Sequence, residues 1–329
     1  MEDRKKEHLH LAFEASVNRA KADKRFMYEP LLAAHPNKEF KAINFLGKKI
    51  KHPFWISSMT GGTKKAASIN AKLAKAAGEF GLGMGLGSCR VLFDSDDFWN
   101  DFKVREYIGD DYPLFSNLGI AQVEKLVEKG EFDKIDFLNQ QLKADGTIIH
   151  INPLQEAFQP EGDRFMHPPI ETIQKVLEKV KSPIIVKEVG QGMGYESLKA
   201  LLQMDLAGIE FGALGGTNFT KLEQMRSTGN NSIFQGFTAV GHTAEEMTLM
   251  VNQIVDEVEV KCKNIIISGG ITSLLDGYYL TQICKLPAII GMGSAFLQYA
   301  IKDYEHLQNF ISQLAKGWQL ADTFLKVKK

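Results

Sequence analysis

The sequence lacks the features that mark membrane, secreted and nucleic-acid-binding proteins. Its 39 Lys and Arg residues nearly cancel its 40 Asp and Glu residues, so the formal net charge is −1, whereas nucleic-acid binding usually needs a strong basic bias. No apolar run is long enough to span a bilayer. The N-terminus is charged over residues 2–7 and has no apolar h-region, so we expect no secretory signal. We therefore expect a cytoplasmic protein that binds neither nucleic acid nor a membrane.

Cysteine is also scarce. The three cysteines, Cys89, Cys262 and Cys284, are odd in number, and no two of them are spaced as CxxC. Such a set is typical of reduced thiols in a cytosolic protein, and it disfavours a disulfide framework or a zinc site. The 329 residues, 44% of them hydrophobic, form an ordinary globular composition that can bury a sizeable core.

One pattern repeats eight times along the chain: a short apolar run that ends in glycine or polar residues. The runs are rich in Ile, Val and Phe, as in parallel strands covered on both sides. Between them lie segments with apolar residues at helical spacing. The apolar runs occupy residues 54–58, 82–87, 114–118, 147–152, 183–189, 207–213, 264–268 and 287–291. The helical segments occupy residues 66–80, 121–129, 134–143, 169–181, 195–204, 243–260 and 274–284.

Strands that alternate with helices predict a parallel sheet, and eight of them predict an α/β fold closed into a (β/α)8 TIM barrel. The alternative is an open doubly wound sheet, which would normally carry a GxGxxG loop after its first strand. The first run ends instead in Met59-Thr60-Gly61-Gly62, which lacks that spacing. The barrel is therefore the favoured fold.

We expect one domain in three parts. Residues 1–50 form an N-terminal extension, with an amphipathic helix over residues 7–21. Residues 51–297 form the barrel, and residues 298–329 form a helical tail. Residues 215–240 are rich in Gly, Thr and Asn without strong periodicity, which predicts a structureless segment that is functional or mobile.

The loops after the seventh and eighth runs indicate a phosphate site. In such barrels the active site lies at the carboxyl ends of the strands, and the last two loops often hold a phosphate on backbone N–H groups. Gly269 and Gly270 follow the seventh run, and Gly293 and Ser294 follow the eighth. Each pair alone would be read as a simple turn, but together, at these positions, they favour phosphate binding.

The fourth and fifth runs carry polar residues that strands rarely contain. His150 and Asn152 are two apart, so they point to the same face, near Gln155 and Glu156. A lone histidine is more often a core residue, but convergent polar groups favour a ligand site. Glu156 is either a Mg²⁺ ligand or a solvated loop residue. Lys187 needs a partner, either an inward carboxylate or an anionic ligand or electron-rich ring.

Together these residues resemble the type 2 isopentenyl diphosphate isomerase family, over nearly the whole chain. The fourth-run block is the most diagnostic because it is long and unusual. The matching strings are RKKEH at 4–8, SMTGG at 58–62, GSCR at 87–90, NLG at 117–119, HINPLQE at 150–156, QPEGD at 159–163, VKEVG at 186–190, GGT at 215–217 and SGGI at 268–271.

The resemblance implies an isomerase of isoprenoid biosynthesis that interconverts isopentenyl and dimethylallyl diphosphate. It implies reduced FMN as acid and base, Mg²⁺, NADPH as reductant, and a homo-oligomer of four or eight chains. The implied FMN contacts are Ser58, Met59, Thr60, Ser88, Asn117, Lys187, Thr217, Gly269, Gly270, Gly293 and Ser294. The implied substrate contacts are Arg4, Lys5, His8, Arg90 and Gln155. Gln155, His150 and Asn152 would serve catalysis, and Glu156 would hold the metal.

Two residues depart from the family pattern. Cys89 stands where the family usually has Gln, which puts the shape of the substrate pocket in question. Thr272 stands where Arg is common, which puts one possible phosphate contact in question. Two other functions stay open. One is an FMN-dependent 2-hydroxy-acid oxidase, which usually needs a His–Arg pair near the later strands; His242 has no adjacent Arg. The other is a flavin- or phosphate-binding regulatory barrel without catalysis.

Overall fold

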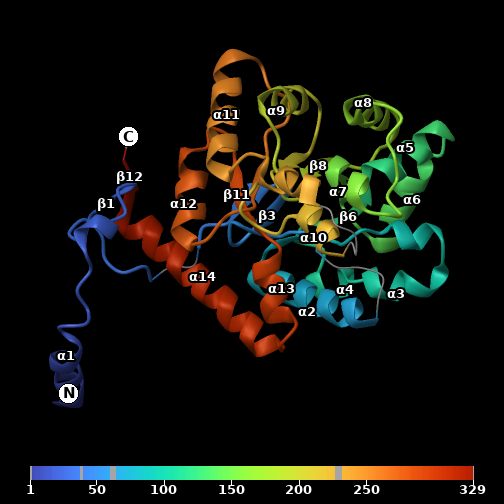
Figure 1. Cartoon of the computed structure of the whole chain (residues 1–329). Helices are drawn as coiled ribbons and strands as arrows, with labels where there is room; N and C mark the ends of the chain where they lie inside the picture. The colour runs from blue at the N-terminus through green and yellow to red at the C-terminus, as the bar shows by residue number, and fades with distance from the viewer. Residues whose placement is uncertain (1, 38–39, 60–63, 227–231, 329) are drawn as a thin grey trace.

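The protein is built around a closed barrel of eight parallel strands (Figure 1). The computed structural model describes residues 2–37, 40–59, 64–226 and 232–328. The barrel closes where the last strand pairs with the first, with Gly291 opposite Trp55. Around the barrel the strands are β4 (Phe54–Ile56), β5 (Gly83–Gly85), β6 (Leu114–Gly119), β7 (Gly146–Ile151), β8 (Ile184–Glu188), β9 (Gly208–Glu210), β10 (Ile265–Ser268) and β11 (Ala288–Met292). Each strand falls within or overlaps one of the eight apolar runs, so the predicted TIM barrel is confirmed.

The helices form an outer layer around the strands (Figure 1). The seven predicted helical segments correspond to α2 (Lys64–Phe80), α5 (Ile120–Glu128), α6 (Asp133–Leu142), α8 (Pro169–Lys179), α9 (Tyr195–Leu202), α11 (Ala244–Glu257) and α12 (Leu274–Ile283). Short helices not expected from the sequence are η2 (Arg90–Phe93), η3 (Asp96–Phe98), α3 (Trp99–Phe102), α4 (Arg105–Ile108) and α7 (Pro153–Phe158). No helix in the described part of the chain is both long enough and apolar enough to cross a membrane.

The inside of the barrel has an apolar floor. Successive side chains of a strand alternate between its two faces, so every second residue points inward. The floor is closed at the amino ends of the strands by Phe45 and Ile50 of the hairpin β2 (Ile43–Phe45) and β3 (Lys48–Ile50). The inward residues of the floor, all fully buried in one cluster, are Trp55, Phe115, Ile148, Ile185, Ile266 and Ile289.

Two residues further along the same strands, the inward positions become polar or glycine. These positions are Ser57, Asn117, His150, Lys187, Ser268 and Gly291. The floor therefore excludes water from the lower half of the barrel, and the next inward position of each strand faces the carboxyl-terminal rim, where ligands of such barrels bind.

The N-terminal end of the chain differs from the sequence expectation. The N-terminal helix α1 (Glu2–Leu11) is shorter than predicted and starts earlier; residues 12–14 form a turn, and a separate short helix, η1 (Arg19–Lys21), follows. Residues 4–20 are exposed, so no apolar face of α1 packs on the barrel as an amphipathic helix would. The tail forms the expected helices α13 (Ser294–Ala300) and α14 (Tyr304–Phe324).

Two segments contain elements that were not predicted. The tail ends in β12 (Leu325–Val327), which pairs antiparallel with β1 (Phe26–Tyr28). This pairing joins strands that are nearly 300 residues apart, which a local pattern cannot reveal. Within the segment 215–240, expected to be structureless, the structure has α10 (Phe219–Arg226) and η4 (Ser232–Ala239). Phe234 and Phe237 pack against Phe158 of α7, and this tertiary contact orders a segment without periodicity.

The floor of the barrel leaves no room for an inward side chain at Gly83 of β5. A Cβ atom at Gly83 would lie 2.4 Å from the Trp55 ring. We expect Gly83→Ala to lower the free energy of unfolding by about 1–3 kcal/mol, because overpacking displaces neighbouring groups. Gly236→Ala is the matched control, since its Cβ would meet no heavy atom within 4 Å, and we expect a change within about 0.5 kcal/mol. Urea unfolding measures both; equal stabilities would contradict the packing of Trp55 against β5.

Candidate functional site

A cavity of about 220 Å³ opens at the carboxyl ends of β8 to β11 and β4. It contains most of the residues for which a cofactor role was implied, although they come from five strands and their loops. Thr60 lies outside the described residues. The implied cofactor residues that line the cavity are Ser58, Met59, Lys187, Thr217, Gly269, Gly270, Gly293 and Ser294. The structure therefore brings these loops together around one cavity.

Of the two loops expected to bind phosphate, one requires glycine at Gly269, and the other packs closely on Met59 at Gly293. Gly269 has a φ of +88°, and a Cβ there would lie 2.1 Å from the carbonyl oxygen of Ala213. A Cβ at Gly293 would lie 2.7 Å from the sulfur of Met59. Both loops thus pack closely on their neighbours, and their own backbone, without side chains, forms this part of the cavity wall.

Several buried polar atoms in the cavity wall lack partners. Among the described residues, no hydrogen bond satisfies the hydroxyls of Ser57 and Ser58 or either carboxylate oxygen of Glu210. Buried polar groups in folded proteins are nearly always hydrogen-bonded. Three unsatisfied side chains around one cavity indicate a polar ligand that supplies the missing partners.

Lys187 projects into the same cavity without the carboxylate partner that was one of its two expected alternatives. Its ammonium donates a hydrogen bond of 3.0 Å to the carbonyl oxygen of Glu188, and no ion pair within 4.0 Å is found for it in the described part of the chain. The Glu188 carboxylate instead accepts hydrogen bonds from the backbone of Gly190, Gln191 and Gly192. Lys187 therefore keeps hydrogen-bonding capacity for a ligand.

A second polar group lies beside this cavity, on β6, β7 and the start of α7. The Nδ1 atom of His150 is 2.7 Å from Oδ1 of Asn117. The amide of Asn152 donates to Oε1 of Gln155 at 3.2 Å and to Oε1 of Glu156 at 2.9 Å. Of the three residues that the sequence grouped for catalysis, Asn152 and Gln155 thus contact each other, whereas His150 contacts Asn117. His150 and Lys187 are partners across β7 and β8, so the two groups adjoin.

His150 is held in its neutral form. Burial and the nearby Lys187 ammonium lower the pKa of its imidazole to about 3. With Asn117 Oδ1 as acceptor, Nδ1 carries the proton and Nε2 keeps a lone pair. At neutral pH this side chain therefore offers one donor and one acceptor, and no positive charge.

The Glu156 carboxylate is oriented by two donors. Oε1 accepts the bond from Asn152, and Oε2 accepts the backbone N–H of Asp163 at 2.7 Å. Asp163 in turn pairs with Arg90 at 3.0 Å and with Lys125 at 2.6 Å. An ionised carboxylate can accept about four bonds, so each oxygen of Glu156 has capacity for a metal ion.

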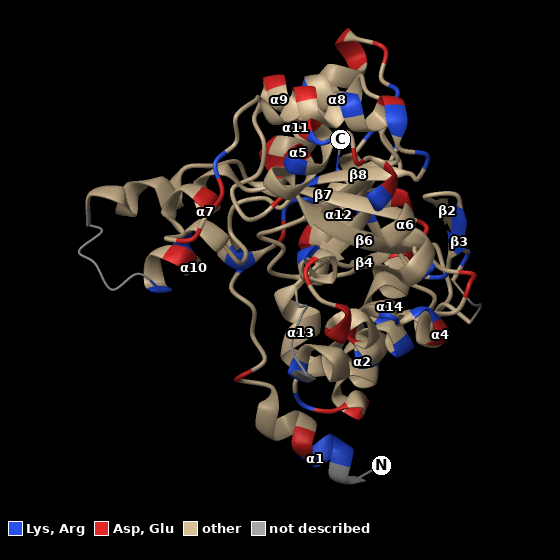
Figure 2. Cartoon of the chain, turned by 90° about the vertical axis from the view of Figure 1, so that its right-hand side faces the viewer, with Lys and Arg blue, Asp and Glu red and all other residues tan. Residues whose placement is uncertain are grey.

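Other implied site residues are not brought to the cavity. Arg4, Lys5 and His8 are exposed on α1, which stands apart from the barrel in both views (Figures 1 and 2). Ser88 and Arg90 are exposed beyond the end of β5, outside the cavity lining. Their roles toward substrate or cofactor stay predictions.

The two departures from the family pattern have structural explanations. The Cys89 thiol is fully buried, and it donates a weak bond of 3.4 Å to the carbonyl oxygen of Gly87. Burial raises the pKa of this thiol to about 12, so it stays protonated and unreactive. Thr272 donates its hydroxyl to Asp276 at 2.6 Å. It therefore orders the start of α12 and does not line the cavity.

Glu210 and Ser57 also line the cavity, and neither was predicted from the sequence. Glu210 ends β9 within an otherwise apolar run, and it is Lys187's partner across the strands. The same two-residue spacing that singled out His150 and Asn152 relates Glu210 to Gly208 and Ser57 to Trp55. Applying strand alternation to every run would have identified both.

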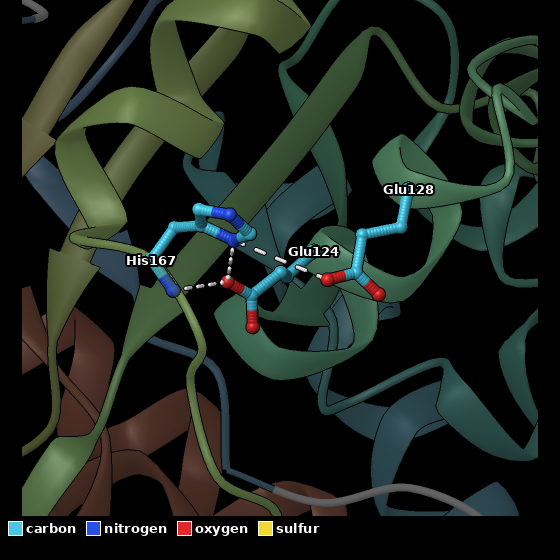
Figure 3. A group of neighbouring side chains, drawn as sticks. All are labelled: Glu124, Glu128 and His167. Atoms are coloured by element: carbon cyan, nitrogen blue, oxygen red, sulfur yellow. Dashed lines mark hydrogen bonds and ion pairs between the residues drawn. The ribbon is translucent and has the colours of Figure 1, made fainter.

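A separate group of potential metal ligands lies on the outer surface. Glu124 and Glu128 of α5 lie beside His167, which precedes α8 (Figure 3). Burial by itself raises the pKa of Glu124, but bonds from the backbone N–H groups of Met166 and His167 outweigh it and hold that pKa below its usual value. Glu124 is thus already used to fasten the segment before α8 to α5.

No model of a protein family matches the chain. The chain is similar in sequence to curated proteins named isopentenyl-diphosphate delta-isomerase. The protein of Rickettsia rickettsii (strain Sheila Smith) is 35% identical over 291 residues, which cover 85% of this chain and 82% of the relative. That of Rickettsia prowazekii (strain Madrid E) is 34% identical over 281 residues, covering 84% of this chain and 80% of the relative.

Solved structures of other barrel enzymes share the fold. A flavocytochrome b2 variant with sulfite bound superposes with a TM-score of 0.62 at 14% identity, over 90% of this chain and 71% of that chain. A mandelate oxidase variant with a monooxide FMN adduct superposes with a TM-score of 0.58 at 12% identity, over 93% and 89% of the two chains. At this identity the likeness shows the barrel architecture alone.

The neutral state of His150 has a measurable consequence. An unfolded histidine takes up a proton near pH 6.5, whereas folded His150 does so only near pH 3. Below about pH 6.5 the unfolded state therefore binds more protons than the folded state. As the pH is lowered from there, His150 decreases the free energy of unfolding by up to about 1.4 kcal/mol per pH unit. We expect ¹⁵N NMR to show a neutral His150 ring at pH 5, and His150→Gln to lose less stability than the wild type between pH 7 and 5. An imidazolium signal from His150 at pH 5 would contradict the assignment.

Proposed function

The chain belongs to the isopentenyl-diphosphate delta-isomerase family, and we propose that it is an FMN-dependent, type 2 member that interconverts isopentenyl and dimethylallyl diphosphate. One observation carries the proposal. The cavity combines the two glycine loops with an available ammonium and unsatisfied buried polar atoms, next to an amide–imidazole group. The glycine loops would bind a phosphate, and the ammonium and the unsatisfied polar atoms would bind the polar edge of a ring. The amide–imidazole group would then contact a second ligand beside that ring.

The cavity residues fit FMN. Gly269, Gly270, Gly293 and Ser294 would hold its phosphate, since their loops stand where barrels of this kind bind phosphate. Lys187, with Ser57 and Ser58, would contact the ring, which supplies their missing partners. The FMN in the similarly folded mandelate oxidase supports this choice of cofactor. When bound and reduced, FMN would supply a proton donor and acceptor and an electron-rich surface.

The second polar group would bind the substrate. Isomerisation adds one proton to the terminal alkene carbon and removes one from C2, with no net oxidation. Gln155, His150 and Asn152 would orient the substrate over the ring, and their fixed dipoles would stabilise the charge that develops in the transition state. Because His150 is neutral and its one N–H is donated to Asn117, its free Nε2 only accepts a hydrogen bond, so this ring would not neutralise the diphosphate.

Charge neutralisation therefore falls to a metal ion and to other cations. Glu156 would hold Mg²⁺, which typically takes one or two carboxylates together with substrate phosphates. Arg90 would contribute its positive charge from its position beside Asp163. Arg4, Lys5 and His8 would reach the diphosphate only if α1 docks on a barrel mouth. The exposed apolar residues of the extension, such as Phe13 at 92% exposure, support such docking in a tetramer or octamer.

The structural neighbours raise a second candidate, oxidation of a 2-hydroxy acid. That chemistry usually needs a histidine and an arginine near the later strands. In the described part of the chain, no arginine lines the cavity, and His242 lies outside the lining. Its ring instead lies next to Gly194, where a Cβ would be 3.2 Å from Nε2. The geometry thus favours the isomerase.

An anaerobic assay with FMN, NADPH, Mg²⁺ and isopentenyl diphosphate tests the proposal by following the formation of dimethylallyl diphosphate.

We expect Lys187→Ala to weaken FMN binding by about tenfold or more, because a charge-assisted hydrogen bond is lost. We expect Gln155→Ala to retain FMN but to lower kcat by about 10²-fold. FMN titration and steady-state rates separate the two effects. A wild-type protein that binds FMN but forms no product would refute the isomerase assignment, and full FMN affinity in Lys187→Ala would remove that residue's role.

A further inference from the structure

Glu210 is the most deeply buried ionisable side chain of the cavity. It is 1% exposed, it lines the cavity, and neither of its oxygens has a partner among the described residues. A buried carboxylate without donors is costly, so the observation requires a donor that only a ligand brings.

The position of Glu210 next to Lys187 narrows the kind of ligand. The two residues are Cα partners on β8 and β9, so their side chains rise from the same level of the barrel into one cavity. Lys187 donates to the Glu188 carbonyl and not to Glu210. The wall therefore presents a donor and an acceptor side by side, neither of which satisfies the other.

Such a pair matches a planar edge on which a carbonyl and an N–H are adjacent. An ammonium offers donors only, and an ionised carboxylate offers acceptors only, so each recognises one half of that edge. The pyrimidine part of an isoalloxazine ring has this order, with N3–H between two carbonyls. We propose that Glu210 is the specificity-determining acceptor for the N3–H of the flavin, beside Lys187 as donor to the neighbouring carbonyl. This inference rests on the proposed function.

The chain offers a graded set of variants. Glu210→Ala removes the acceptor. Glu210→Gln keeps an acceptor oxygen but removes the negative charge, which would otherwise oppose electron uptake by an adjacent ring. Glu124→Gln is the matched control, because Glu124 is also a buried carboxylate but lies on α5, away from the cavity.

The test is titration of the apoprotein with FMN and with 3-methyl-FMN, in which a methyl group replaces the N3 hydrogen. We expect the wild type and Glu124→Gln to bind 3-methyl-FMN at least about tenfold more weakly, the effect of losing a hydrogen bond to a charged group. We expect Glu210→Ala to bind both ligands with similar affinity, at about the level of the wild type with the methylated ligand. In Glu210→Gln the midpoint potential of bound FMN should rise.

Three results would overturn the inference. The first is equal affinity of the wild type for the two flavins, which needs no variant to fold. The second is a Glu210→Ala protein that still discriminates between them, and the third is an unchanged or lowered potential in Glu210→Gln. A wild-type protein that binds neither flavin would overturn the proposed function itself, so the two failures are distinguishable.

Discussion

The arrangement of the site depends on the inward face of each strand, which is apolar near its amino end and polar or glycine near its carboxyl end. Trp55, Phe115 and Ile148 fill the lower half of the barrel so completely that β5 carries glycine opposite the tryptophan ring. The next inward residues face the rim because strand alternation allows no other direction. Polar side chains distributed over the whole sequence thus meet at one level, where a ligand can contact them together.

This convergence brings together groups that do not satisfy one another. Lys187, Glu210 and His150 lie on three adjacent strands and are partners in register, but none of them makes an ion pair within 4.0 Å with another described residue. Burial and the positive charge of Lys187 keep the His150 imidazole neutral by lowering its pKa. The hydroxyls of Ser57 and Ser58 add to the unsatisfied set. A ligand that supplied the missing partners would stabilise the folded protein by mass action, which links cofactor binding to stability.

Much of this could be predicted from the sequence, and the remainder was hidden for physical reasons. The eight apolar runs identified the barrel because parallel strands are covered on both faces and leave a continuous hydrophobic signal. Gly269 and Gly293 were recognisable by their position after the last two strands. Glu210 was not recognised, although strand alternation places it on the inward face of β9; its placement at the level of Lys187 depends on the register of β8 and β9, which the sequence does not contain. The pairing of β1 with β12 is likewise a long-range contact.

The chain's membership in the isomerase family and the geometry of its barrel mouth lead to one account, in which the rim from β8 to β4 seats a flavin. A crystal structure of the protein grown with saturating FMN would test this most directly. The account predicts electron density for the tricyclic ring beside Lys187, with the phosphate at the loops of Gly269 and Gly293. A cavity without flavin under these conditions, or a ring bound elsewhere on the barrel, would contradict it.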